Sequence, residues 1–281
     1  MIHLGLVGYP LGHSLSPKLH KAALQSCRLE GDYSLFPIAP NDEQVLKYLL
    51  SRVRSGEIHG LNVTIPHKQT VISLLDKLTP TAQAIGAVNT IYMQRNKLIG
   101  HNTDAQGFLT DLTEFLDSSP RISRNSSLGS RRSALILGAG GSARAVVFAL
   151  LNEGWDVTIV ARRIEQAQGI ATLFKEHTLG TTNNPSNTDL SNIILIVNTT
   201  PAGMSPDVGQ SPWPANIPFP QHAAIYDLVY NPCETKLVRD ARSQGLSATT
   251  GLGMLIEQAA LSFEIWTGYS PSREIMRKSI N

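Results

Sequence analysis

Cysteine is scarce in this 281-residue chain, which holds only Cys27 and Cys233. The two lie far apart and form neither a CxxC pair nor a set with metal-ligand spacing, so a disulfide framework and a zinc site are both disfavoured. The eight histidines form no HExxH motif, and no Gly-x-Ser-x-Gly elbow or P-loop occurs. A hydrolase and a kinase therefore lack support. A reducing cytoplasm is the compartment that we expect.

The chain also lacks a strong charge of one sign and any long apolar run. Its 24 Lys and Arg and 22 Asp and Glu leave a formal net charge of +2, without the clustered basic field that binds a nucleic-acid backbone. No stretch is long and apolar enough to span a bilayer, and no basic leader precedes the first apolar run. We expect a soluble protein with no nucleic-acid or membrane partner, and the sequence leaves a monomer and a homodimer equally open.

What the sequence does contain is an alternation of short apolar runs and helical patterns, which predicts an α/β fold of about two domains. After IHLGLVG, the pattern predicts a helix from Pro17, strands near 35–38 and 61–65, and a helix from about Gln69 to Leu78. The stretch SALILGAGGSARAVVFALLNEGWDVTIVARR has the order strand, glycine turn, helix and strand, which is half of a nucleotide-binding unit. Residues 117–133 are polar and aperiodic, so we interpret them as a solvated insertion.

The glycine turn of that unit is the first candidate site. Directly after a strand, its backbone amides and the helix N-terminus can hold a pyrophosphate. The turn ends in alanine instead of a third glycine, which is tolerated because that position only packs helix against strand. A doubly wound fold whose turn binds nothing is the alternative. The candidate cofactor-binding residues here are Gly138, Ala139, Gly140, Gly141, Ser142 and Ala143.

The end of the next strand indicates which dinucleotide is bound. It carries Ala161, Arg162 and Arg163 where an NAD-binding unit has a carboxylate for the ribose hydroxyls. Two guanidiniums attract a 2′-phosphate, so NADP is the expected cofactor. Solvent-facing arginines are the alternative, although a first helical turn is a poor place for a cation.

A loop with two serines suggests a site for a small carboxylate. Ser16, followed by Pro17, marks a helix start as its N-cap, and capping alone would explain it. Ser14 adds a second hydroxyl to the same loop. Together the two hydroxyls suit a carboxylate ligand.

Lys68 and Asp104 are the candidate acid–base groups. Lys68 stands at the start of the helix that follows Pro66, where the helix dipole opposes a cation. That placement favours a role in proton transfer, whereas an exposed lysine is the alternative. Asp104 begins another helix, where Asn102 or Thr103 can act as the cap. Capping alone could explain the acid.

The order of these motifs resembles the shikimate dehydrogenase family from end to end. The stretches that carry the resemblance are GYPLGHSLSPKLH, GLNVTIPHK, AIGAVNTIY, GHNTDAQGF, GAGGSARA, NTTPAGM, YDLVYNP and GLGMLIEQAALSFEIWTG. It implies a substrate-binding catalytic domain of residues 1–107, to which 251–281 returns, and a Rossmann NADP-binding domain of residues 108–250. It also implies the NADPH-dependent reduction of 3-dehydroshikimate to shikimate in chorismate and aromatic amino acid biosynthesis.

The resemblance further implies the roles of single residues. Lys68 would donate a proton to the ketone, and Asp104 would orient the lysine. Ser14, Ser16 and Tyr226 would hold the substrate carboxylate. The residues beside the ring hydroxyls would be Asn62, Thr64, Asn89 and Gln258. Those beside the cofactor would be Asn198, Thr199, Ala202, Met204, Leu228, Gly251 and Met254.

One departure from the family and two alternative functions remain. Gln166 stands where many members carry an arginine, which leaves open whether Arg163 makes the second phosphate contact. A quinate/shikimate dehydrogenase with relaxed NAD or NADP use would be favoured by an acid after the arginine pair, where Ile164 stands. A non-catalytic metabolite sensor would be favoured by loss of Lys68 or Asp104, and both are present.

Overall fold

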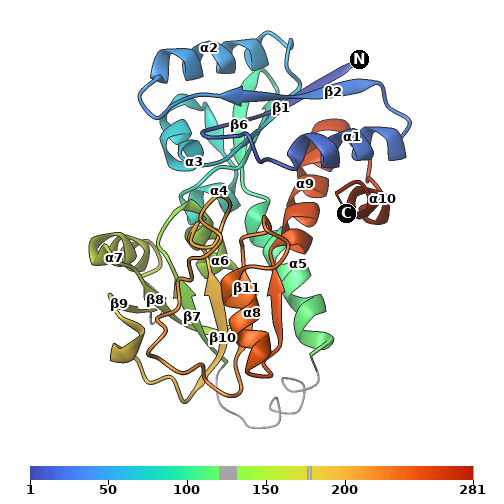
Figure 1. Ribbon diagram of the computed structural model, residues 1–281. Coiled ribbons are helices and arrows are strands. Elements are labelled where there is room, and N and C mark those ends of the chain that lie inside the picture. The colour runs from blue at the N-terminus through green and yellow to red at the C-terminus, as the bar shows by residue number, and fades with distance from the viewer. Residues whose placement is uncertain (120–131, 176, 178, 281) are drawn as a thin grey trace. The chain divides into compact units, whose positions relative to one another are not determined.

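The computed structural model describes residues 1–119, 132–175, 177 and 179–280 (Figure 1). The chain divides into two compact units, Met1–Gly107 with Leu255–Asn281 and Phe108–Met254. The expected return at residue 251 falls within the second unit, just before Leu255. Of the expected insertion at 117–133, residues 120–131 lie outside the described residues.

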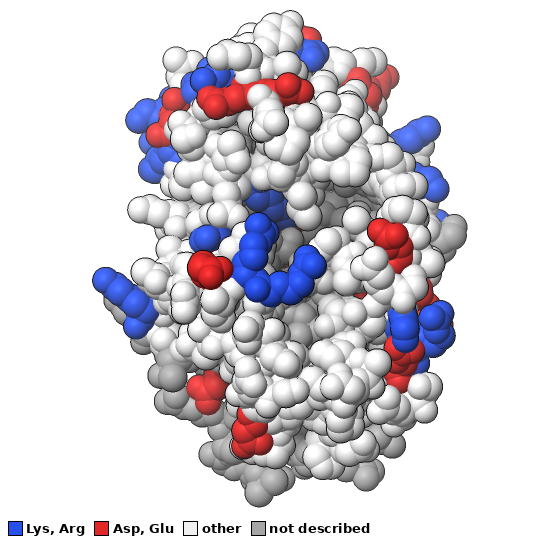
Figure 2. Space-filling model, turned by 60° about the vertical axis from the view of Figure 1, so that its left-hand side comes forward, with Lys and Arg blue, Asp and Glu red and all other residues white. Residues whose placement is uncertain are grey.

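Charged side chains of both signs are distributed over the face shown in Figure 2. Among the described residues, no helix has the length and apolar character needed to cross a membrane. The described part of the chain also contains no group of three or more His, Cys, Asp or Glu side chains placed to hold a metal ion.

The first unit is built on a six-stranded mixed sheet in the order β2-β1-β3-β5-β6-β4. Strand β1 pairs in parallel with β2 and β3, whereas β5 is antiparallel to both β3 and β6, and β4 is parallel to β6. The strands are β1 (Ile2–Gly8), β2 (Gly31–Pro37), β3 (Gly60–Val63), β4 (Lys77–Leu78), β5 (Thr90–Gln94) and β6 (Lys97–His101). The helices of this unit are α1 (Ser16–Ser26), α2 (Glu43–Arg54), α3 (His67–Thr70), α4 (Pro80–Ile85) and α10 (Arg273–Lys278).

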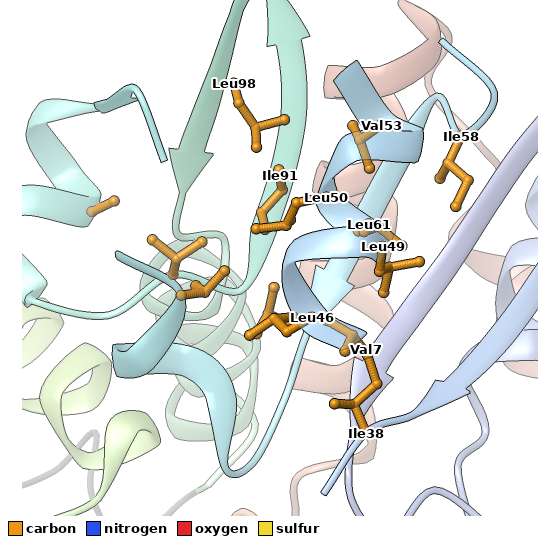
Figure 3. Packing of buried hydrophobic residues seen from close by; sticks show 14 residues of the cluster. Val7, Ile38, Leu46, Leu49, Leu50, Val53, Ile58, Leu61, Ile91 and Leu98 are labelled. Atoms are coloured by element: carbon orange, nitrogen blue, oxygen red, sulfur yellow. The ribbon is translucent and has the colours of Figure 1, made fainter. Parts of the chain in front are cut away.

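Helix α2 packs the core of the first unit onto this sheet. Its buried residues follow the i, i+3, i+4, i+7 spacing of one helical face. They are Leu46, Leu49, Leu50 and Val53. Figure 3 shows them beside Leu61 of β3 and Ile91 of β5, which belong to the same hydrophobic cluster. The apolar face of the amphipathic helix α2 thus packs against the sheet.

Helix α9 (Leu252–Thr267) also packs against β3 and β5. The indole Nε1 of Trp266 donates to the carbonyl oxygen of Ile91 at 3.0 Å. A Cβ atom at Gly60 would overlap the Trp266 ring, so only glycine allows this approach. The strongly apolar C-terminal helix therefore docks on the sheet of the first unit, with Gln258 on the same helix.

The prediction of a helix from about Gln69 to Leu78 is wrong. The segment instead forms α3, a 3₁₀ turn (Val71–Leu74) and strand β4. Leu75 adopts an extended conformation with φ −101° and ψ 153°, and Asp76 exchanges hydrogen bonds with the backbone of Leu98. The apolar side chains of the segment pack into the α2 cluster. Pairing with β6 thus overrides the local helical pattern.

The second unit is a six-stranded parallel sheet in the order β12-β11-β10-β7-β8-β9. Counted from β7, this is the 3-2-1-4-5-6 order of a Rossmann fold, so the expected α/β class is confirmed. The order of the strands reverses between β7 and β10, and such sheets bind ligands at this point, at the carboxyl ends of their strands.

The strands of this unit are β7 (Ser133–Leu137), β8 (Asp156–Val160), β9 (Leu179–Thr182), β10 (Ile193–Asn198), β11 (Ala224–Asp227) and β12 (Ala248–Thr250). Its helices are α6 (Gly141–Asn152), α7 (Ile164–Leu173) and α8 (Lys236–Ser243), with a 3₁₀ turn at Pro185–Asn187. Helix α5 (Asp104–Asp117) begins in the first unit and continues into the second. The apolar strands, such as SALIL and IILIVN, have the continuous hydrophobic character of buried parallel strands.

Gly253, in the first turn of α9, gives a prediction about stability. A Cβ atom there would overlap the carboxylate of Asp111, which accepts a hydrogen bond from the buried hydroxyl of Tyr226. Gly253→Ala should displace Asp111 and leave this hydroxyl without its partner, which lowers the free energy of unfolding by about 1–3 kcal/mol. Urea denaturation monitored by circular dichroism measures the change.

Gly169→Ala in α7 is the matched control, because a Cβ atom there meets nothing within 4 Å. An alanine in an open helical position should stabilise the protein by about 0.5–1 kcal/mol. A Gly253→Ala protein as stable as the parent would show that Asp111 has room to move.

Candidate active site

Lys68 and Asp104 form a largely buried ion pair in the first unit. Lys68 Nζ lies 2.5 Å from Asp104 Oδ2, and the two side chains are 12% and 6% exposed. Lys68 belongs to α3, and its carbonyl oxygen accepts a hydrogen bond of 2.7 Å from the backbone N–H of Val88, just before β5. Asp104 is the first residue of α5. The fold thus brings together the two residues expected to form the acid–base pair.

Further hydrogen bonds hold the Asp104 carboxylate in one orientation. Asn102 caps α5, since its Oδ1 accepts from the backbone N–H of Asp104 at 3.0 Å and of Ala105 at 3.4 Å. Asp104 Oδ1 accepts from Asn89 Nδ2 at 2.8 Å. Both carboxylate oxygens are therefore engaged, one with the lysine and one with an amide.

The residues expected beside the ring hydroxyls lie close to this pair or on the adjacent strand. Asn89 Nδ2 also approaches Gln258 Oε1 at 3.3 Å. Asn62 is 5% exposed; its Nδ2 donates to Ser262 Oγ at 2.9 Å, and its Oδ1 accepts from the hydroxyl of Tyr33 at 2.8 Å. The hydrogen-bonding capacity of the Asn62 amide is thus largely used within the protein. Thr64, which follows β3, has no side-chain hydrogen bond among the described residues.

The serine loop differs in detail from the expectation. Ser16 is the first residue of α1, so its expected role as N-cap is wrong, and Leu15 occupies that position. The backbone N–H of Ser16 donates to Ser14 Oγ at 3.3 Å. The hydroxyl of Ser14 therefore satisfies a free amide of the helix start. The hydroxyl of Ser16 has no hydrogen-bond partner within the described chain and remains available to a ligand.

Tyr226 does not fit the expected contact with a substrate carboxylate. It lies in β11 of the second unit with 0% exposure, and its hydroxyl donates to Asp111. Its ring packs edge-on against Phe108 at 5.2 Å. Burial, with a smaller contribution from the charge of Asp111, raises the pKa of Tyr226 well above its ordinary value. This tyrosine supports the packing of the unit.

The second tyrosine of YDLVYNP was not singled out from the sequence. Tyr230 follows the carboxyl end of β11, the edge at which parallel sheets bind ligands. It is only partly exposed, burial raises its pKa, and its hydroxyl has no partner among the described residues. Tyr226 lies within β11 and Tyr230 lies beyond its end. This difference in position decides which of the two tyrosines is available to a ligand.

The glycine turn of the second unit leaves room for a ligand at a helix N-terminus. It joins β7 to α6, with Gly140 as the N-cap. Gly138 has φ +108°, and a Cβ atom there would lie 2.7 Å from Thr199 Oγ1. A Cβ atom at Gly140 would meet nothing within 4 Å, so the turn borders open space. Free amides of a 12-residue helix facing open space fit a pyrophosphate.

Two exposed arginines follow β8 in the same unit. Arg163 is the N-cap of α7, and Arg162 precedes it. Neither guanidinium forms an ion pair within the described residues, so both remain available to an anion. Arg144, in α6 just past the turn, was not found from the sequence. Its Nε is buried without a partner, and burial lowers its pKa.

Buried polar groups hold the loop after β10 in place. Asn198 is fully buried; its Nδ2 donates to Asp227 Oδ1 at 2.7 Å, and its Oδ1 accepts from the backbone N–H of Thr200 at 2.9 Å. Asn198 therefore shapes the loop from within. Burial raises the pKa of Asp227 to about 6, against the hydrogen bonds from Thr235, the Val229 amide and Asn198 that favour the charged form.

The other residues expected beside the cofactor lie at the carboxyl ends of the central strands. The hydroxyl of Thr199 donates to the carbonyl oxygen of Leu137 at 2.8 Å, which ties this loop to the end of β7. A Cβ atom at Gly251 would lie 2.5 Å from the carbonyl oxygen of Leu228, so the segments after β11 and β12 approach closely. Met204 is 43% exposed, whereas Met254 is buried. Ala202 lies in the same loop as Met204.

Two family models and many full-length relatives are similar to this chain. The model of the shikimate dehydrogenase substrate binding domain matches residues 6–91, and that of the shikimate 5′-dehydrogenase C-terminal domain matches residues 251–280. A shikimate dehydrogenase (NADP(+)) from Desulforamulus reducens is 40% identical over 285 residues, covering 99% of this chain and 94% of the relative.

Solved structures resemble the chain over nearly its whole length. Shikimate 5-dehydrogenase from Thermus thermophilus, in complex with NADP(H) and shikimate, is 38% identical with a TM-score of 0.85, covering 99% of this chain and 98% of that one. Quinate dehydrogenase from Corynebacterium glutamicum, in complex with NAD, is 29% identical with a TM-score of 0.85 and the same two coverages, 99% and 98%. Since the sequence identity to the curated relative reaches 40% over nearly all of both chains, the protein belongs to the shikimate dehydrogenase family.

Proposed function

We propose that this protein catalyses the NADPH-dependent reduction of 3-dehydroshikimate to shikimate, in the biosynthesis of chorismate and the aromatic amino acids. The observation that carries the proposal is the largely buried Lys68–Asp104 pair, at 2.5 Å, beside a set of amide and hydroxyl groups. The names of the full-length relatives support the same reaction. In this proposal the first unit binds the substrate and the second binds NADP.

The residues of the first unit have distinct tasks in this reaction. Lys68 Nζ carries three N–H donors, of which one is directed at Asp104 and the others are free to serve a substrate oxygen. Lys68 donates a proton to the ketone oxygen as that oxygen gains negative charge. Asp104 holds Nζ in place, and Asn89 holds Asp104. The cofactor, when bound, supplies the hydride.

The second unit holds the cofactor through backbone and charge. The amides from Gly140 to Ser142 would bind the pyrophosphate at the start of α6. Arg162 would bind the 2′-phosphate, with Arg163 as its neighbour. Three segments, with Met204 after β10, Leu228 after β11 and Gly251 after β12, would lie beside the nicotinamide at the carboxyl ends of the strands.

Ser14 and Ser16 would bind the substrate carboxylate through their hydroxyls. Ser14→Ala should weaken shikimate binding by about 1–3 kcal/mol, because the carboxylate loses a donor that water cannot replace in a closed site. Isothermal titration calorimetry on the folded variant measures the dissociation constant. An unchanged value would remove the serine loop from the substrate site.

A spectrophotometric assay tests the proposed function. The parent protein should reduce NADP⁺ with shikimate at a kcat/KM above that for the other three pairs of NADP⁺ or NAD⁺ with shikimate or quinate. A preference for quinate and NAD⁺ would instead assign the activity named for the Corynebacterium glutamicum structure. Binding of shikimate without turnover would indicate a metabolite sensor.

We also propose a cytoplasmic protein that works as a monomer or a homodimer with small-molecule ligands only. Both cysteines are free, which suits a reducing compartment. Fractionation of the native host and light scattering of the purified protein would test the two statements. Recovery in the membrane fraction, or a larger assembly, would contradict them.

A further inference from the structure

Three buried hydroxyl groups lie directly behind the catalytic pair in the first unit. They belong to Thr90 at the start of β5, Thr103 just before α5, and Ser262 in α9, and we call them the hydroxyl cluster. Thr90 and Ser262 are 0% exposed and Thr103 is 1% exposed. The oxygen of Ser262 lies 2.8 Å from that of Thr90 and 3.1 Å from that of Thr103. None of the three hydroxyls takes part in the proton transfer proposed for Lys68 and Asp104.

The backbone N–H of Thr103, together with the hydroxyl of Thr90, determines which way the amide of Asn89 faces. The backbone N–H of Thr103 lies 2.8 Å from one amide atom of Asn89, and an N–H can only donate, so that atom is Oδ1. The hydroxyl of Thr90 donates to the same Oδ1 at 2.8 Å. The other atom is therefore Nδ2, which donates to Asp104 Oδ1 at 2.8 Å.

The other hydroxyls leave Thr90 as the main side-chain donor to that oxygen. Thr103 Oγ1 has a nearer acceptor in the carbonyl oxygen of Gln258, at 3.0 Å, than in Asn89 Oδ1, at 3.2 Å. Ser262 accepts from Asn62 Nδ2 at 2.9 Å and is 2.9 Å from the carbonyl oxygen of Gln258. The Thr90 hydroxyl lies 2.8 Å from Asn89 Oδ1, which can only accept, and equally 2.8 Å from Ser262 Oγ, which can donate or accept.

We propose that Thr90 is a positioning residue for the reduction, which fixes the Asn89 amide so that it directs Asp104 toward Lys68. Without the Thr90 hydroxyl, Asn89 Oδ1 keeps the backbone N–H of Thr103 at 2.8 Å and its more distant hydroxyl at 3.2 Å, so the amide faces the same way but can tilt. A tilted amide lengthens its hydrogen bond to Asp104 Oδ1. The Asp104 carboxylate then moves away from its position beside Lys68 Nζ. The lysine, as the proton donor, loses its fixed position.

The inference rests on the proposed function, so its test begins with turnover of shikimate and NADP⁺ by the parent protein. Thr90→Val keeps the shape of the side chain and removes the hydroxyl, whereas Thr90→Ser keeps the hydroxyl. Thr90→Val should lower kcat by about tenfold to a hundredfold, as expected for a small misplacement of a catalytic group. The KM for shikimate should change much less than kcat. Thr90→Ser should restore kcat to near the parent value.

Thermal denaturation separates positioning from a loss of folding. Thr90→Val should lower kcat even at temperatures at which circular dichroism shows the variant to be fully folded. Thr79→Val is the matched control, since its hydroxyl caps α4 at Ala82 and contacts His101 Nδ1 at 2.8 Å. It should lower the melting temperature and leave kcat unchanged.

Each outcome decides between distinct explanations. A parent-like kcat in Thr90→Val, or an equal loss in Thr90→Val and Thr90→Ser, would overturn the role of the hydroxyl. If valine is not accommodated, Thr90→Ala provides a second hydroxyl-free variant; the same loss of kcat is expected, and a parent-like kcat would again overturn that role. If the parent protein does not turn over shikimate with NADP⁺, the proposed function itself is refuted. The results with the Thr90 variants cannot refute it.

Discussion

Replacing Lys68 by arginine or by alanine is expected to lower kcat by about 10²–10⁴-fold, the usual contribution of general acid–base catalysis. Arginine keeps the positive charge but does not release a proton near neutral pH. If charge alone were needed, Lys68→Arg would remain active while Lys68→Ala failed. Steady-state assays of shikimate oxidation over a range of pH measure both variants. A near-full kcat in Lys68→Arg would reduce the lysine to a binding role.

Asp104→Asn tests the partner in the same series. Its amide can still accept from Lys68 but carries no charge, so it holds the lysine less firmly and we expect a lower kcat. Lys236→Ala is a matched control, because Lys236 Nζ also lies 2.5 Å from an acid, Asp240, but both side chains are more than a third exposed at 39% and 36%. An exposed pair of this kind contributes little, and kcat should not change.

The parts of the candidate site that could be predicted lie within short stretches of chain. The glycine turn and the pair Arg162–Arg163 each follow a strand and precede a helix, so local pattern alone placed them. The fold class followed from the alternation of strands and helices, and the structure confirms it. The specific roles of these residues came from the resemblance to a family and stay predictions.

The parts that could not be predicted depend on contacts between distant segments. Ser262 touches Asn62 across 200 positions of sequence, so nothing near either residue indicates the hydroxyl cluster. Tyr226 and Tyr230 stand in one motif, and only the place where β11 ends distinguishes the buried residue from the available one. The helix expected near Gln69 failed for the same reason, because pairing with β6 is a long-range interaction.

The second large effect is expected from Arg162→Ala, which should raise the KM for NADP⁺ by about ten- to a hundredfold and leave NAD⁺ use nearly unchanged. A charge-assisted hydrogen bond contributes about 1.5–3 kcal/mol, and only NADP carries the phosphate that receives it. The arginine has no acidic partner among the described residues, so removing it leaves no protein charge unpaired. Initial rates with each cofactor at saturating shikimate give the two KM values.

Two variants make the Arg162 result specific. Arg239→Ala removes an exposed arginine from α8 and should alter neither KM. Arg163→Ala decides whether the second arginine takes the place that Gln166 leaves without a charge: a loss confined to NADP⁺ means that it does, and no loss means that Arg162 acts alone. Equal losses for NADP⁺ and NAD⁺ in Arg162→Ala would refute the phosphate contact, because an interaction with the shared part of the two cofactors cannot discriminate between them.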